Sequence, residues 1–142
     1  KRACPPPALM AFDAPTREFC TTRRSITNTP LQALVLWNDE QHVEAARELA
    51  ERVLREDAED HPRLVSLYRR TTGLRPDART TERLARSLAH FRARYEDSPA
   101  DARRLSSVGM APREAELSDA ELAAWTMIAS ACLNLDTTIT RS

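Results

Sequence analysis

Only two glycines, Gly73 and Gly109, occur among the 142 residues of this chain. Alanine, leucine, arginine and glutamate are abundant, and all four favour the helix over other backbone conformations. No segment shows a convincing strand pattern. The sequence therefore predicts an all-α protein, with helix almost everywhere outside the segments that carry proline.

Size and charge limit the classes of protein to which the chain can belong. Its 142 residues are enough for one compact domain and too few for two of usual size. Acidic and basic residues balance at 21 each, so no net field attracts nucleic acid or an anionic membrane. No apolar run approaches the roughly 20 residues of a membrane-spanning helix. We expect no nucleic-acid partner and no membrane span.

The first 29 residues differ from the rest because they are rich in proline and lack a helical period. Pro5-Pro6-Pro7 favours an extended polyproline segment, and Ala14-Pro15 disfavours helix. Apolar anchors are present at Leu9, Met10, Phe12 and Phe19. We expect residues 1–29 to form an ordered but irregular arm, a truncated part of a larger domain, and residues 30–142 to form a helical domain.

Apolar residues recur at a spacing of three and four over most of the remaining sequence. This spacing predicts about five helices in an orthogonal or hairpin-packed bundle. They cover approximately residues 30–37, 40–55, 62–72, 80–97 and 119–133. A shorter helix over residues 101–105 lies within an ambiguous connection, and the tail from Asp136 is expected to be irregular or briefly extended.

Polar residues mark the ends of these helices. Thr29 is expected to cap the first helix, since Pro30 suits the first helical position, where an N–H has no intrahelical partner. Asp39 is expected to cap the second helix, and Gly73 to end the third. The run Ser118-Asp119-Ala120-Glu121 matches a capping box, in which the serine and glutamate side chains satisfy backbone N–H groups.

The same spacing predicts which side chains form the core. The helix at residues 30–37 is apolar on nearly every side, which predicts burial on most of its faces. Trp37 and Trp125 lie in apolar helical registers, so we expect core positions rather than positions that stack on sugars. The predicted core comprises Leu31, Leu34, Val35, Val43, Leu49, Val53, Leu67, Leu88, Phe91, Leu122, Trp125 and Ile128.

A candidate anion site precedes the first helix. A helix N-terminus offers unpaired N–H groups and a partial positive charge, and arginines lie just before this one. The site would hold a sulfate or carboxylate group of a sugar, or a haem propionate from a neighbouring module. Its residues are Arg23, Arg24, Thr27, Asn28 and Thr29. Alternatively, the two arginines fasten the arm to the helices by pairing with the carboxylates of Asp13, Glu18 or Asp39.

Catalytic and metal sites are disfavoured by the surroundings of each candidate. Asp13 and Glu18 resemble a glycosidase carboxylate pair, but the arginines nearby would keep both ionised. Cys20 with His42 lies in no protease-like context. The three cysteines and three histidines lack metal-ligand spacing. The sequence does not decide between a Cys4–Cys20 disulfide and unpaired cysteines. We expect no catalytic residue, no metal and no cofactor in this chain.

The run FDAPTREFCTTRRSITNTPLQALVLWND, residues 12–39, resembles the signature of the planctomycete and verrucomicrobial "PSD-one" domain of unknown function. The similarity extends over residues 5–54 and returns at Trp125 and the closing LNLDTTITR. Residues 56–117 match in helical pattern alone. The motif positions that the resemblance singles out as structural are Asp13, Arg17, Glu18, Cys20, Asn38 and Asp39.

That domain typically closes large exported proteins that carry cytochrome-c-like modules. The resemblance implies a C-terminal segment of such a protein, in the periplasm, with any haem c bound elsewhere in the full-length chain. Its implied partners are the remaining domains of that chain, and the anion site adds an acidic or sulfated carbohydrate. We expect a non-catalytic assembly or ligand-binding segment. The alternative is part of an oxidoreductase or carbohydrate-active enzyme whose active site is completed by missing sequence.

Overall fold

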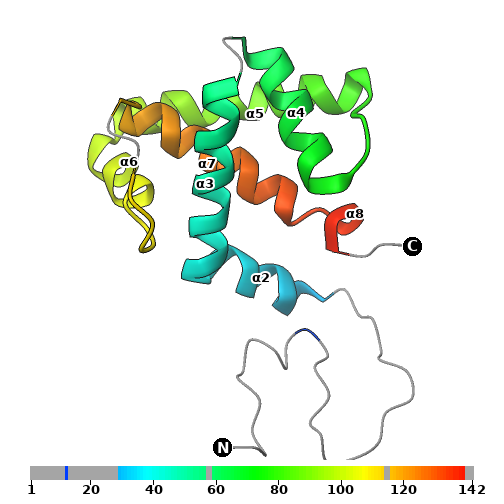
Figure 1. Cartoon of the computed structure of the whole chain (residues 1–142), viewed down its shortest axis with the longest axis horizontal. Coiled ribbons are helices and arrows are strands. Elements are labelled where there is room, and N and C mark those ends of the chain that lie inside the picture. Colours follow the sequence, from blue (N-terminus) through cyan, green and yellow to red (C-terminus); the bar gives the residue numbers. More distant parts are fainter. Residues whose placement is uncertain (1–11, 13–28, 57–58, 114–115, 140–142) are drawn as a thin grey trace, which may run out of the picture.

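The structure is a computed structural model that describes residues 12, 29–56, 59–113 and 116–139. These residues form seven α-helices and no strand, so the all-α prediction is confirmed (Figure 1). Of the predicted arm, only Phe12 and Thr29 are described. In chain order the helices are α2 (Pro30–Asn38), α3 (Glu40–Glu56), α4 (Asp60–Thr72), α5 (Ala78–Asp97), α6 (Pro99–Ser106), α7 (Asp119–Leu133) and α8 (Asp136–Ile139).

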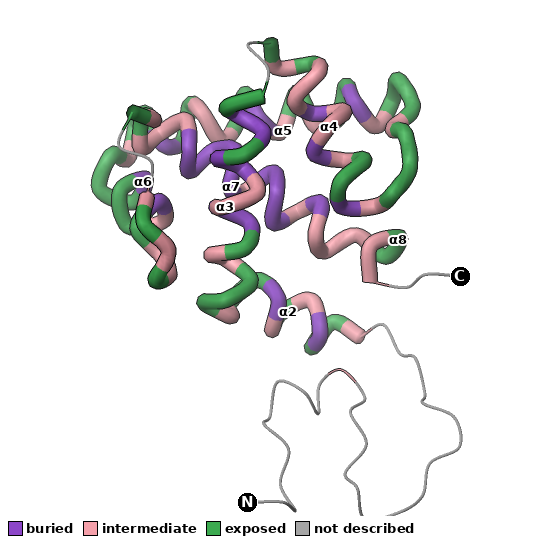
Figure 2. Tube along the Cα trace, viewed as in Figure 1, coloured by how far each residue is buried: buried purple, intermediate pink, exposed green. Residues whose placement is uncertain are grey.

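Helix α7 forms the centre of the domain, and α3, α5 and α6 pack against it. Its sequence carries charge only in the first turn, at Asp119 and Glu121, and beyond that turn it is apolar or small on every side. A helix of this kind needs neighbours on all its faces. Nine of its 15 residues are accordingly buried, and Figure 2 shows them in the middle of the fold.

The helices around α7 are amphipathic, and each turns one apolar stripe inward. On α3 the stripe includes two fully buried alanines, which let its backbone approach its neighbours closely. In Figure 1 α3 runs steeply across α5 and α7. The buried apolar side chains are Ala46, Ala50, Val53 and Leu54 on α3, Leu64 and Leu67 on α4, Leu88 and Tyr95 on α5, and Ala102 on α6.

Three of the predicted helix ends are confirmed. Thr29 caps α2 through a capping box, because its hydroxyl accepts from Gln32 N at 3.3 Å and Gln32 Oε1 accepts from Thr29 N at 2.9 Å. Asp39 caps α3, where its Oδ1 accepts from the backbone N–H of His42 at 3.2 Å. Gly73 ends α4 in the left-handed region, at φ 76°, where glycine carries no steric penalty.

The core prediction is wrong for Leu31, Leu34 and Trp37 of helix α2. Leu31 and Leu34 are each 58% exposed and Trp37 is 40% exposed, because this short helix packs mainly on α3 at the edge of the domain. The other predicted core residues lie inside or at the margin of the core. Val53, Leu67, Leu88, Leu122, Trp125 and Ile128 are buried, whereas Val35, Val43, Leu49 and Phe91 are half-buried.

Several predicted boundaries also need correction. Ser118 occupies the N-cap position of α7 but makes no side-chain cap bond, so the predicted capping box is absent there. The Glu121 carboxylate accepts instead from Arg92 and Trp125, which are stronger partners for a half-buried charge. Helix α6 is longer than expected, and the tail contains the short helix α8 instead of irregular chain.

Candidate functional site

The anion site predicted before α2 lies largely outside the described residues. Thr29 is its one described member, and the capping box engages both its hydroxyl and its backbone N–H. The site therefore stays a prediction. The residues beyond the described part of the chain are Arg23, Arg24, Thr27 and Asn28 of this site, and Asp13, Arg17, Glu18 and Cys20 of the motif.

The two remaining motif residues, Asn38 and Asp39, form the joint between α2 and α3. Asn38 Nδ2 donates to the carbonyl of Leu34 at 2.7 Å, and the Asp39 N–H donates to the carbonyl of Val35 at 2.8 Å. The hydrogen bond from the His42 side chain is the main cause that lowers the pKa of Asp39. Both motif residues therefore have a structural role here.

A buried ion pair on α3 accounts for a second group of charged side chains. Arg47 and Glu51 are 1% and 2% exposed, and Arg47 Nη1 donates to Glu51 Oε1 at 2.5 Å. The same guanidinium donates to the carbonyls of Val108 at 3.2 Å and Ala111 at 2.9 Å. It thereby ties the connection between α6 and α7 to α3, which makes this cluster structural.

A third cluster joins three helices around Arg92 of α5. Its guanidinium donates to both carboxylate oxygens of Asp60 on α4 and to both of Glu121 on α7. The Trp125 Nε1 donates to Glu121 at 2.8 Å. The hydrogen bonds from Arg92 are the main cause that lowers the pKa of Asp60. A carboxylate held ionised in this way is unsuited to act as a general acid.

Cys132 is buried in α7, and burial raises the pKa of its thiol to about 12. Such a thiol is not nucleophilic near neutral pH. Within the described residues, no three or more histidine, cysteine or acidic side chains are grouped as a metal site requires. No helix of that part of the chain has the length and apolarity to cross a membrane.

A different charge pattern occurs on the outer side of α5. Residues 69–94 contain eight arginines and only two acidic residues, Asp77 and Glu82, in a chain whose net charge is zero. On α5 the basic side chains recur every three or four residues, which places them on one side of the helix. We call this the basic face of α5, and its members, all exposed, are Arg79, Arg83, Arg86, His90 and Arg94.

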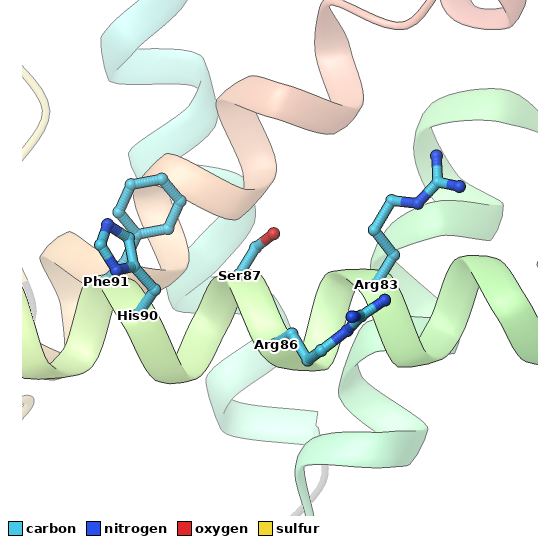
Figure 3. Close-up of a pocket in the computed structure, with 5 residues that line it drawn as sticks. All are labelled: Arg83, Arg86, Ser87, His90 and Phe91. Carbon is cyan, nitrogen blue, oxygen red and sulfur yellow. The ribbon is translucent and has the colours of Figure 1, made fainter.

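An open groove lies along the middle of the basic face (Figure 3). Its lining side chains all come from α5, and they are Arg83, Arg86, Ser87, His90 and Phe91. In Figure 3 the two arginines lie at one end and the rings of His90 and Phe91 at the other, with Ser87 between them. The groove therefore combines guanidinium donors, a hydroxyl and an aromatic edge, which suits an anionic ligand.

A second surface feature is the outer side of α2. We call Leu31, Leu34 and Trp37 the apolar flank of α2, since all three are large, apolar and exposed. Sequence reasoning placed these side chains in the core because the helix is apolar all round. It also missed the basic face of α5, although the three-four spacing of arginines over residues 79–94 is visible in the sequence.

Comparison with known proteins adds one relationship. The family model described as PSD1, protein of unknown function (DUF1553), matches residues 1–88 of the chain. The match includes the motif region, α2, α3, α4 and the first half of α5. No curated protein and no solved structure matches the chain.

Proposed function

The chain belongs to the PSD1 family of proteins of unknown function, and we propose that it is a non-catalytic assembly segment of a larger protein. Its role would be to present a surface on which the remaining domains of its own full-length chain dock. In line with the resemblance of its motif, that protein would be exported and associated with cytochrome-c-like modules, with any haem c bound outside this segment.

The observation that carries this proposal is the apolar flank of α2. Leu31 and Leu34 are each 58% exposed on a helix of nine residues, and Trp37 beside them is 40% exposed. Scattered exposed apolar residues need no explanation, but adjacent large ones mark interaction sites. Full burial of a leucine side chain is favourable by about 1.5–3 kcal/mol, so a domain that covers this flank would form a more stable complex with the chain.

The charged clusters support a non-catalytic role. Arg47, Glu51 and Arg92 form ion pairs and hydrogen bonds that join helices and connections to one another. A general acid or a nucleophile needs a pKa matched to its task. The pKa of the Asp60 carboxyl is instead lowered by Arg92, and the pKa of the Cys132 thiol is raised by burial. These groups stabilise the fold on which the apolar flank is presented.

The alternative function is a part of an oxidoreductase or carbohydrate-active enzyme. In that case this segment would supply part of the active site, and sequence outside this chain would complete it. A redox assay and a polysaccharide-cleavage assay on the full-length protein distinguish the two. Activity that survives deletion of residues 30–142 would place the catalytic groups elsewhere and leave assembly as the role of this segment.

Hydrogen exchange tests the assembly proposal directly. Peptides that cover residues 30–38 are followed in this chain alone and in the full-length protein, and at least tenfold slower exchange is expected in the latter. Leu31→Gln with Leu34→Gln should abolish that difference. The matched control is Leu74→Gln with Met110→Gln, two exposed apolar residues far from α2 in the sequence. Equal exchange in both proteins would overturn the proposal.

A further inference from the structure

We propose that the basic face of α5 binds a linear anionic polysaccharide through its sulfate or carboxylate groups. This goes beyond the proposed assembly function, since it involves a different helix and a different kind of partner. The inference rests on three observations: the periodic placement of the basic side chains, the absence of ion-pair partners for Arg83 and Arg86 among the described residues, and the groove that these two arginines help to line.

The first observation is the length and straightness of the face. From Arg79 to Arg94 the basic positions are separated by four, three, four and four residues, so they stay on one side of a helix of 3.6 residues per turn. At 1.5 Å per residue the row extends over about 22 Å. Between Arg79 and Arg94 the one acidic residue is Glu82, while Asp77 precedes the row and Glu96 and Asp97 follow it. A row of this kind matches an extended chain with repeated negative charges.

The second observation is that the groove arginines are available. Among the described residues, neither Arg83 nor Arg86 has a hydrogen-bond or ion-pair partner. The pKa of Asp77 is lowered mainly by hydrogen bonds from Thr80, and the charge of Arg83 is a lesser cause. Arg47 and Arg92, by contrast, are fully engaged in internal pairs. An incoming anion would therefore gain charge-assisted hydrogen bonds from Arg83 and Arg86 without the loss of an existing pair.

The third observation is the chemistry of the groove. Arginine presents a planar fork that matches carboxylate and sulfate oxygens, and a serine hydroxyl both donates to and accepts from a sugar hydroxyl. Ser87 lies between the arginines and His90, within reach of the same ligand (Figure 3). The aromatic edge of Phe91 completes one end of the groove with apolar surface.

A polysaccharide fits this groove better than a nucleic acid does. Proteins that bind single strands stack successive bases on several aromatic side chains. The groove contains one such ring besides His90, that of Phe91, and this ring is half-buried against the core. A sugar polymer needs only periodic anionic groups and hydroxyls, which this groove supplies.

The test measures binding of the whole chain to immobilised polymers. The probes are dextran sulfate, polygalacturonate, neutral dextran and a single-stranded oligonucleotide. We expect retention on one or both anionic polysaccharides, none on neutral dextran, and weaker binding as salt rises, because exposed charges are screened. Retention on neutral dextran, or tighter binding of the oligonucleotide than of either anionic polysaccharide, would overturn the proposal.

Matched variants assign the binding to α5. Arg83→Gln with Arg86→Gln should weaken binding roughly tenfold, a difference of about 1.4 kcal/mol. The control, Arg52→Gln with Arg104→Gln, removes the same charge from exposed arginines on α3 and α6 and should leave binding nearly unchanged. Thermal melts verify that both proteins stay folded. Equal losses in the two variants would mean that binding reports only net charge, and the proposed site would be rejected.

Discussion

Arg47 and Glu51 form a buried ion pair one turn apart on α3, with 2.5 Å between Nη1 and Oε1. Burial of two charges costs several kcal/mol each unless additional hydrogen bonds satisfy them. Arg47 meets this condition through the carbonyls of Val108 and Ala111. Nearby, Glu44 Oε1 accepts from the backbone N–H of Met110 at 2.8 Å. The pair therefore stabilises α3 and the connection between α6 and α7 together.

Removal of one member of the pair should be strongly destabilising. We expect Arg47→Met to lower the free energy of unfolding by about 3–5 kcal/mol, because the buried Glu51 carboxylate would lose its 2.5 Å partner and keep only the exposed Arg55 at 3.6 Å. Urea denaturation provides the measurement. The exposed Arg52→Met serves as the control and should change stability by no more than about 0.5 kcal/mol. A loss below about 1 kcal/mol for Arg47→Met would mean that the pair is not buried in solution.

The two glycines should differ in their tolerance of alanine. Both have positive φ, 76° for Gly73 and 96° for Gly109, where a side chain costs about 1–2 kcal/mol. At Gly73 a Cβ atom meets nothing within 4 Å, whereas at Gly109 it would lie 2.7 Å from Glu44 Cβ. Gly109→Ala should therefore lower the melting temperature more than Gly73→Ala. Equal shifts in melting temperature for the two variants would show that the connection between α6 and α7, which contains Gly109, can move away from α3 at little cost.

Leucine truncation distinguishes the edge of the domain from its core. Leu34→Ala should change the free energy of unfolding of the isolated chain by less than about 1 kcal/mol, since Leu34 is 58% exposed. Leu67→Ala should lower it by about 2–5 kcal/mol, since Leu67 is fully buried. Both values come from chemical denaturation. A large loss at Leu34 would indicate that another part of the chain, or a second copy, covers the flank.

Stability should depend on Asp60 in acid. The folded-state pKa of Asp60 is lowered by hydrogen bonds from Arg92, so the stabilisation is fully present above the ordinary value of 3.8 and is lost as the pH falls below it. The difference in free energy of unfolding between the wild-type chain and Asp60→Asn should therefore shrink between about pH 4 and pH 2. The effect should be modest, because the Asp60 side chain is 43% exposed. A stability difference between the two proteins that grows on acidification would contradict this prediction.

The anion site predicted before α2 has its own test. If Arg23 and Arg24 bind an anion, sulfate should raise the melting temperature of the chain, and Arg23→Ala with Arg24→Ala should abolish that rise while helical content is retained. If they instead form internal ion pairs that fasten the arm to the helices, sulfate should not change the melting temperature. The double variant should then lose about 3–5 kcal/mol of stability, because a buried carboxylate would lose its partner. Melts with and without sulfate distinguish the two.

Local signals in the sequence predicted much of the fold. The three-four spacing and the low glycine content predicted the helices, and Thr29, Asp39 and Gly73 were correctly placed at their ends. These features depend on neighbours within one or two turns, so they can be recognised in a linear sequence. The predicted all-α class follows from the same local preferences. The sequence also contained, unrecognised, the periodic arginines of α5.

Position within the domain was decided only by tertiary structure. Helices α2 and α7 are both apolar all round, yet α7 is covered on every side and α2 mainly by α3, so Leu34 is exposed and Trp125 is buried. Ser118 and Glu121 match a capping box, but Glu121 pairs with Arg92, 29 residues away in the sequence. Burial and long-range pairing depend on which elements meet in space, and local sequence does not encode that. Periodicity determined the helices, and packing determined which of their faces stay exposed.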